Sequence, residues 1–203
     1  MSWRILALMA LLALAFAILV GFATSRSLDR SPSQTAAIGG PFQLLNTAGA
    51  TVDQSLLKGK WSVVFFGFTH CPDVCPTTLF AMAQVEPLLG DRARKLQTVF
   101  ISVDPERDTV AQMRAYAAND AFPRRLIALT GSVAQVDAVA SAYRVYHQRV
   151  GSGSDYSVNH AAYSYLMNPH GDLACVLPYG LTPELTAAKI SSAMQAGANA
   201  NRC

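Results

Sequence analysis

The sequence predicts an α/β fold, and three observations support this prediction. Three short runs rich in apolar and β-branched residues, 62–68, 97–103 and 126–129, are typical of buried strands in a parallel sheet. Segments with helical spacing or helix-start signals separate these runs. The last part of the chain changes to two strands joined by a tight turn and then a helix. The order β-α-β-α-β followed by β-β-α is that of a thioredoxin-like domain.

The first elements of this domain extend it at its N-terminus. Residues 41–53 predict a short hairpin that turns through 46–49, where Asn and Gly favour a turn. The buried strand Ser62–Phe68 follows. Thr77–Leu89 then has apolar residues at helical spacing and ends before Gly90, a residue type that commonly terminates helices.

The next two helices begin at capping sequences. Residues 109–112 and 132–135 read Thr-Val-Ala-Gln and Ser-Val-Ala-Gln. In a capping box the hydroxyl and the Gln side chain satisfy backbone groups at the start of the helix. These helices are expected to run to about Ala118 and Tyr143.

The C-terminal part is expected to be a hairpin and a helix. His160–Met167 and Asp172–Leu177 are its predicted strands, joined by a turn at 168–171. Pro183, which is tolerated in the first position of a helix, opens a last helix toward Met194. The chain shows no internal repeat and no second domain.

An apolar segment precedes the domain. Residues 5–23 contain no charge and would reach about 28 Å as a helix, close to the hydrocarbon thickness of a bilayer. The apolar part of a signal peptide is usually about 7 to 15 residues long, so an uncleaved anchor is favoured over a cleaved signal. We therefore expect one transmembrane helix within residues 1–23, a tether at 24–40 and one domain at 41–203, with the domain outside the cell's cytoplasm.

The charge balance of the domain excludes one class of partner. From Ser31 onward there are thirteen Lys and Arg against twelve Asp and Glu. Such a balance indicates no nucleic-acid partner.

Two of the four cysteines occupy a chemically informative position. Cys71 and Cys75 stand where an apolar strand gives way to a helix. The unpaired N–H groups at a helix start favour the thiolate, which binds soft metals and attacks disulfides. If either thiol forms a disulfide, their spacing favours pairing with each other. The other two cysteines, Cys175 and Cys203, could form a structural disulfide. Alternatively, Cys175 is a buried thiol in a strand and Cys203 a free thiol in the C-terminal tail; the sequence leaves both alternatives open.

Among the four histidines, His160 is the best partner for this pair. It follows the polar loop 151–159, and in a thioredoxin-like sheet this end lies beside the start of the helix that carries the cysteines. The alternative is a strand histidine bonded to the backbone. His70 adjoins Cys71 and should point to the opposite face, while His147 and His170 are expected on a strand surface and in a turn.

Two thiolates and one imidazole form a soft ligand set of low coordination number. Such a set suits Cu(I), and it holds Cu(II) when water or a further ligand joins. Structural zinc normally takes four protein ligands, and the sequence offers no evident fourth. Copper is therefore the predicted metal.

Four segments together resemble the Sco/SenC family. They are 67–79 (GFTHCPDVCPTTL), 101–109 (ISVDPERDT), 129–131 (LTG) and His160 followed by 165–171 (YLMNPHG), and the match runs in order from about Gly39 to Met194. The resemblance implies a membrane-anchored, thioredoxin-like copper chaperone for the dinuclear copper site of cytochrome c oxidase subunit II.

This resemblance implies Cys71, Cys75 and His160 as the copper ligands and an upstream donor that supplies the copper. In a bacterium it implies a single-pass protein of the inner (cytoplasmic) membrane with its C-terminal domain in the periplasm. Family members often carry Asp before the metal histidine, where this chain has Asn159. The tuning of His160 or the recognition of the partner is then expected to differ.

Three other functions use the same residues. A thiol–disulfide reductase would keep the oxidase cysteines reduced, although such enzymes usually carry C-x2-C and a facing cis-proline, and this chain has no proline between Pro123 and Pro169. A peroxide reductase would need Thr or Ser where Pro72 stands. A copper- or redox-sensing membrane protein would bind without delivering metal. If the chain is an enzyme, the sequence favours a thiol–disulfide oxidoreductase.

Overall fold

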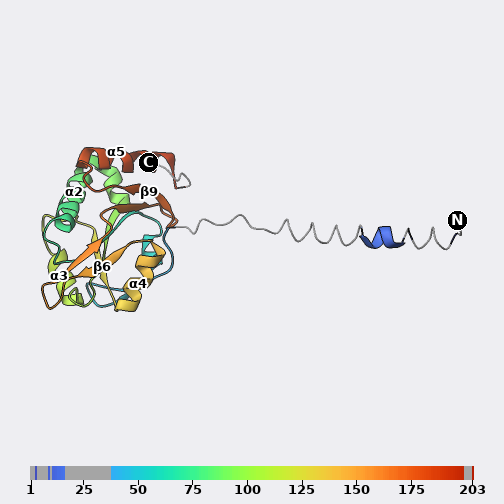
Figure 1. Ribbon diagram of the computed structural model, residues 1–203. Coiled ribbons are helices and arrows are strands. Elements are labelled where there is room, and N and C mark those ends of the chain that lie inside the picture. The colour runs from blue at the N-terminus through green and yellow to red at the C-terminus, as the bar shows by residue number, and fades with distance from the viewer. Residues whose placement is uncertain (1–2, 4–8, 10, 17–37, 199–202) are drawn as a thin grey trace. The chain divides into compact units, whose positions relative to one another are not determined.

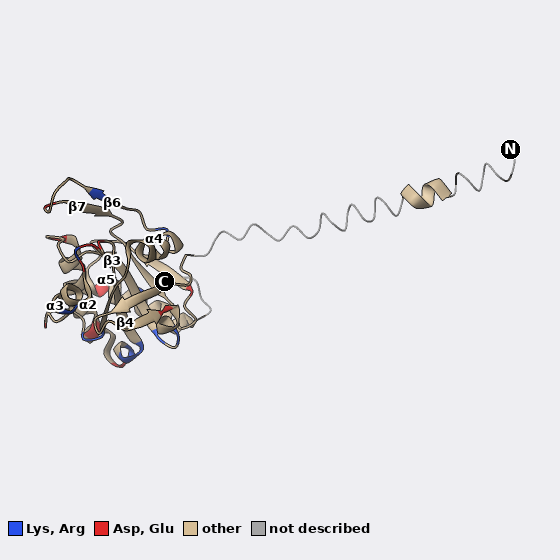
Figure 2. Cartoon of the chain, turned by 90° about the horizontal axis from the view of Figure 1, so that it is seen from below, with Lys and Arg blue, Asp and Glu red and all other residues tan. Residues whose placement is uncertain are grey.

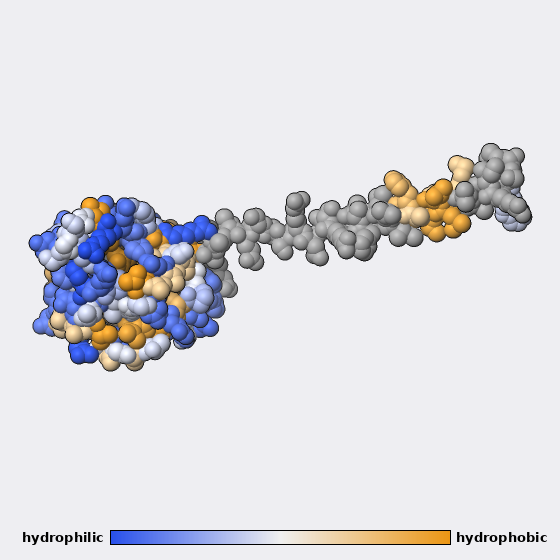
Figure 3. All heavy atoms as spheres, turned by 60° about the horizontal axis from the view of Figure 1, so that its bottom comes forward, coloured by the Kyte–Doolittle hydropathy of each residue, from blue (hydrophilic) through white to orange (hydrophobic). Residues whose placement is uncertain are grey.

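The computed structural model describes residues 3, 9, 11–16, 38–198 and 203. The chain divides into two compact units, 1–36 and 37–203. The described residues of the first unit are helical, and their apolar side chains are exposed (Figure 3). None of the described helices has the length and apolar character needed to cross a bilayer. Most of the predicted anchor and most of the tether lie outside the described residues.

The second unit contains nine strands, four α-helices and two short 3-10 helices among its described residues (Figure 1). In chain order they are β1 (Gln43–Asn46), β2 (Thr51–Asp53), η1 (Gln54–Leu57), β3 (Trp61–Gly67), α2 (Val74–Leu89), η2 (Gly90–Lys95), β4 (Leu96–Ser102), α3 (Val110–Ala117), β5 (Leu126–Thr130), α4 (Val133–Ala142), β6 (His147–Val150), β7 (Ser157–His160), β8 (Ser164–Met167), β9 (Leu173–Leu177) and α5 (Pro183–Ala196).

Seven of these strands form one sheet in the order β2-β1-β5-β4-β3-β8-β9. The central strands β3, β4 and β5 are parallel, whereas β8 and β9 are antiparallel neighbours and the β1–β2 hairpin extends the opposite edge. The predicted α/β order, including the N-terminal hairpin and the C-terminal β-β-α segment, is confirmed.

A second sheet of two strands was not predicted. β6 and β7 pair as a hairpin, with His147 opposite His160. His160 therefore ends β7, and the prediction that it begins the following strand was wrong. The buried strand of the main sheet starts only at Ser164, because residues 161–163 carry the chain from the small hairpin to the main sheet. The alternation of apolar and polar residues in this segment is too short to separate two strands.

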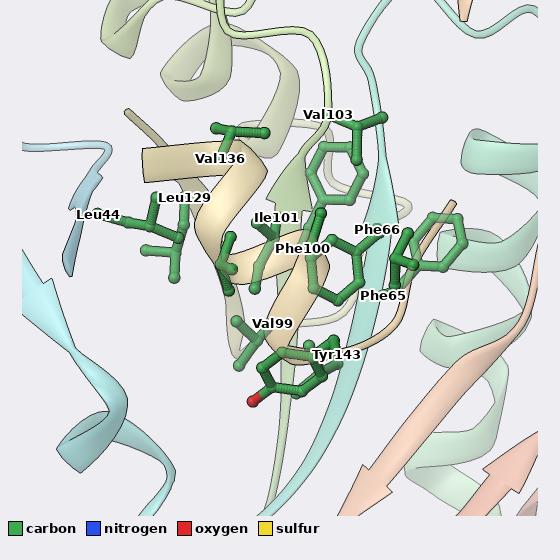
Figure 4. Packing of buried hydrophobic residues seen from close by; sticks show 14 of the residues in the cluster. Leu44, Phe65, Phe66, Val99, Phe100, Ile101, Val103, Leu129, Val136 and Tyr143 are labelled. Atoms are coloured by element: carbon green, nitrogen blue, oxygen red, sulfur yellow. The ribbon is translucent and has the colours of Figure 1, made fainter. Parts of the chain in front are cut away.

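The core covers both faces of β3, whose seven residues are all buried. On one face Phe65 stacks on Phe100, and Phe100 contacts Tyr116 of α3. On the other face Phe66 contacts Tyr143, the residue that directly follows α4. Figure 4 shows part of this cluster around β4. A strand enclosed in this way gives the loop that follows Gly67 a rigid starting point.

Side chains define the helix starts. Ser132 and Gln135 form the predicted capping box. Thr109 caps α3 through the N–H of Gln112, but the Gln112 side chain donates to Thr69 in a distant loop, 3.1 Å away. Helix α2 begins at Val74, three residues before the predicted start.

A disulfide joins Cys175 of β9 to Cys203, with 6.0 Å between their Cα atoms. This resolves the pairing that the sequence left open. The bridge ties the end of the chain to the edge of the main sheet, and it leaves Cys71 and Cys75 as free thiols.

Candidate metal centre

The two free cysteines lie at the carboxyl end of β3. The chain leaves the sheet at Gly67, and the N–H of Cys71 donates to the carbonyl of Phe68, 3.2 Å away. Cys75 lies in the first turn of α2 and is fully buried, whereas Cys71 precedes the helix and is partly exposed. The backbone N–H of Cys75 donates to the sulfur of Cys71, 3.5 Å away. The predicted position at a strand–helix junction is confirmed.

The imidazole of His160 reaches this pair from β7. Its Nε2 lies 3.6 Å from the Cys75 sulfur, and the ligand atoms of Cys71, Cys75 and His160 all lie within 4.8 Å of one another. Sulfur and nitrogen bonded to one ion at about 2.3 and 2.0 Å, as in zinc sites, are about 3.5 to 3.8 Å apart. The Cys75–His160 distance already has the size expected for two ligands of a single ion.

Two sets of contacts hold the His160 ring. Its Nδ1 lies 2.9 Å from the carbonyl oxygen of Ala161, which only accepts hydrogen bonds, so Nδ1 carries the proton. The lone pair then resides on Nε2, which faces the sulfur. The rings of Phe65 and Phe68 meet the imidazole edge to face, with centroids 6.2 and 5.8 Å away. The ring is thereby oriented for ligation.

The other three histidines lie apart from this group. His70 is half exposed, and its Nδ1 is 3.1 Å from the hydroxyl of Thr69. His147, on β6, contacts the carboxylate of Asp137 at 3.0 Å. His170 lies in the turn between β8 and β9. These placements agree with those expected from the sequence.

The two thiols differ strongly in acidity. A hydrogen bond from the Cys75 thiol lowers the pKa of Cys71 to about 5, with help from backbone N–H groups. The same hydrogen bond and burial raise the pKa of Cys75. At neutral pH the pair therefore holds one proton on the buried sulfur and one thiolate on the accessible sulfur.

We expect the alkylation rate of Cys71 by iodoacetamide to have its inflection near pH 5, whereas an ordinary thiol has it near about 8.5. Since the folded pKa is lowered, this thiolate stabilises the fold fully above about pH 8.5, and the contribution is lost as pH falls toward 5. Residue-resolved mass spectrometry measures the rate. Cys75→Ala, which removes the hydrogen-bond donor, should move the inflection upward; a native inflection at the ordinary value would contradict the assignment.

A buried carboxylate fixes the cysteine loop. Asp108 accepts hydrogen bonds from the N–H of Thr69 at 3.0 Å, from the Thr69 hydroxyl at 2.6 Å and from the hydroxyl of Ser102 at 2.7 Å. Its side chain is completely buried, and burial raises its pKa. Because Ser102 ends β4, Asp108 joins the loop before Cys71 to the neighbouring strand.

A second cluster fixes the hairpin that carries His160. Asp104 accepts hydrogen bonds from Nε of Arg107 at 2.6 Å and from the hydroxyl of Tyr156 at 2.5 Å. The guanidinium of Arg107 lies 3.7 Å from the Tyr156 ring centroid, and Arg149 of β6 stacks on the same ring at 3.6 Å. Tyr156 directly precedes β7, so this cluster sets the start of the strand that ends at His160.

Residues 104–108 lie within a segment that resembles the Sco/SenC family, but no role for them could be predicted from the sequence. One sequence signal could have identified these residues: acidic residues and an arginine follow one another closely, directly after a buried strand. In the structure this one segment holds both the cysteine loop and the histidine hairpin.

Gly67 lies next to the buried sulfur of Cys75. A Cβ at this position would be 2.7 Å from the sulfur of Cys75 and 2.8 Å from the Phe100 ring. We expect Gly67→Ala to destabilise the fold by about 1 to 3 kcal/mol and to weaken metal binding, because the sulfur must move. Urea denaturation and metal titration measure both. Gly40→Ala is the control, since its Cβ meets only ordinary contact at 3.5 Å; equal effects of the two changes would contradict the prediction.

Comparison with known proteins identifies relatives of this chain in sequence and in fold. The family model described as SCO1/SenC matches residues 30–195. The Arabidopsis thaliana "Protein SCO1 homolog 1, mitochondrial" is 46% identical over 136 residues, which are 66% of this chain and 40% of that protein. "Protein SenC" of Rhodobacter capsulatus is 36% identical over 165 residues, which are 81% of this chain and 74% of that protein.

A solved structure extends the similarity to three dimensions. The structure of Bradyrhizobium japonicum ScoI with copper bound has a TM-score of 0.70 and 43% sequence identity, and the match covers 78% of this chain and 99% of that one. The aligned part is less than half of the longer Arabidopsis relative. Since the family model spans most of the sequence, the chain belongs to the SCO1/SenC family.

Proposed function

We propose that this protein is a membrane-anchored copper chaperone, which binds copper through Cys71, Cys75 and His160 and delivers it to the dinuclear copper site of cytochrome c oxidase subunit II. The convergence of these three ligand atoms within 4.8 Å carries the proposal. The copper in the related Bradyrhizobium japonicum structure supports it.

The donor set fits copper. Two sulfurs and one imidazole nitrogen are soft ligands, and they are the only His, Cys, Asp or Glu side chains that the described residues place in such a group. Cu(I) is held by these three, and Cu(II) when water or another ligand is added. Binding displaces the remaining thiol proton from Cys75, so uptake at neutral pH releases about one proton per ion.

The different exposure of the sulfurs suits transfer by ligand exchange. Cys71 is partly exposed, so a thiol of the partner can approach copper there first, while Cys75 and His160 still hold the ion. The partner's donors then replace these two ligands in turn. Copper moves between proteins without being released as a free ion.

Anchoring follows from the uncharged segment 5–23, with residues 24–40 as tether and 41–203 as the copper-binding domain. In a bacterium the protein then lies in the inner membrane with this domain in the periplasm. An upstream copper donor loads the site on the same side of the membrane.

A thiol–disulfide reductase is the second candidate, favoured by the acidity difference between the two thiols. The Cys71 thiolate would attack a disulfide of the target and release one target thiolate. Cys75 would then lose its proton and attack Cys71, which releases the second target thiol. The chain's dithiol is oxidised to a disulfide as the target disulfide is reduced to two thiols.

Two parallel reactions separate these functions. Full-length reduced protein loaded with Cu(I) is mixed anaerobically with the reduced, copper-free soluble domain of subunit II, and the copper on each protein is measured after separation. Copper-free reduced protein is mixed with the same domain carrying a disulfide, and the thiols are counted. If the protein is a copper chaperone, we expect copper to be transferred in the first reaction. Thiol formation in the second reaction without copper transfer in the first would instead favour the thiol–disulfide reductase.

A further inference from the structure

Lysines and arginines gather at one end of the domain. Lys60, Lys95 and Arg125 directly precede β3, β4 and β5, which are parallel neighbours, so they lie together where these strands begin. We call this the basic end. Its exposed cations are Lys58, Lys60, Arg92, Arg94, Lys95, Arg124 and Arg125. In Figure 2 blue segments lie along the border of the domain near β4, away from the β6–β7 hairpin.

The charge of the domain is segregated. The seven cations of the basic end accompany five acids, Asp53, Glu86, Asp91, Asp120 and Asp172, of which Asp53 interacts with Lys58. The other described residues of the domain carry five cations and seven acids. A domain that is neutral as a whole therefore has a positive end and a negative remainder.

Part of the basic end is hollowed. Arg94, Arg124 and Arg125 line one cavity of about 460 Å³ beside Glu86 and Pro87. Arg125 is held in place by a hydrogen bond to the Ala93 carbonyl at 2.7 Å. Guanidinium groups arranged around a hollow suit a phosphate group, because each presents several N–H donors.

The polypeptide enters the domain at this same end. The N–H of Gly39 donates to the carbonyl of Ala142, and Gly39 lies beside Met167, which pairs with Ser62 near the start of β3. The metal centre follows the opposite end of β3, and seven residues of strand separate the two ends by about 20 Å.

If the chain is anchored through its apolar run, the number of residues before the domain limits how far this end can lie from the membrane. Fourteen residues, 24–37, separate the apolar run from Ile38. Fourteen residues cannot span more than about 50 Å. Two of its residues, Arg26 and Arg30, have the same charge as the basic end.

We propose that the basic end is a docking surface for anionic phospholipid headgroups. The inference rests on the proposed membrane anchor and adds an orientation to it. An acidic protein surface would satisfy the same charges, but the tether brings this end to the bilayer first. Docking directs the metal centre away from the lipid, toward a partner's soluble domain.

The test uses the full chain reconstituted in nanodiscs that contain a gadolinium-labelled lipid headgroup. Amide NMR signals are compared between discs of phosphatidylcholine alone and discs that also contain phosphatidylglycerol. We expect the signals of 58–60, 92–95 and 124–125 to broaden severalfold more in anionic discs, and those of 71–75 and 157–160 to stay unchanged. High salt should remove the difference.

Paired variants make the result specific. Lys60→Gln/Lys95→Gln should reduce the broadening, while Arg114→Gln/Lys189→Gln, with the same change of net charge, should leave it. Broadening that is independent of phosphatidylglycerol, or is greatest at 71–75, would overturn the proposal. The proposal would also be overturned if the signals of the basic end did not broaden in anionic discs while an acidic polypeptide still bound there. Co-purification with the discs tests the anchor separately, and copper titration of the same sample tests the proposed function.

Discussion

Replacing both thiols, as in Cys71→Ser/Cys75→Ser, is expected to abolish tight binding of Cu(I). Hydroxyl groups are hard and protonated at neutral pH, so they do not replace soft thiolates. His160→Ala keeps the thiols but removes the oriented nitrogen 3.6 Å from the Cys75 sulfur. We expect it to lower affinity by more than about 100-fold, since loss of an outer hydrogen-bond partner alone costs about 10- to 100-fold.

Anaerobic competition with a Cu(I) chelator measures this affinity and the copper bound per chain. His147→Ala and His170→Ala are matched controls, because each removes an imidazole outside the ligand group. The native chain and both controls should bind about one copper tightly. Copper retained at native affinity by the double cysteine variant would show that the ion lies elsewhere.

The second large effect is expected at a residue that touches no ligand atom. Asp108→Ala should destabilise the fold by about 2 to 4 kcal/mol, because it creates a void and leaves the partly buried N–H of Thr69 without an acceptor. The loop before Cys71 loses its link to Ser102, so copper affinity should fall as well. Urea denaturation and chelator competition measure the two effects.

The pH dependence of this destabilisation tests its origin. Burial raises the pKa of Asp108, so its carboxyl stabilises the fold most when protonated, below about pH 4, and less as pH rises through the folded pKa. The difference in unfolding free energy between native protein and Asp108→Ala should therefore be larger at about pH 4 than at about pH 7. Asp137→Asn, at an exposed contact with His147, should cost at most about 1 kcal/mol. Equal losses for the two variants would refute a special role of the buried carboxylate.

Local patterns in the sequence determined most of the architecture. The parallel strands, the hairpin extension, the Ser132 cap and the position of Cys71 and Cys75 all depend on residues close together along the chain. Periodicity and capping chemistry act over the same short range, which is why they could be predicted. The choice of His160 needed more, namely an argument from sheet topology and a family resemblance.

Tertiary structure decided the features that depend on long-range contacts. Cys75 and His160 are separated by 85 positions, and Thr69 and Asp108 by 39, so no local pattern specifies that they meet. The small β6–β7 hairpin, the acidity difference between the thiols and the Cys175–Cys203 bridge likewise arise from packing and burial. The sequence alone determined which residues could hold a metal; their meeting, and the carboxylates that hold them in place, required the folded chain, because burial and hydrogen-bond geometry exist only there.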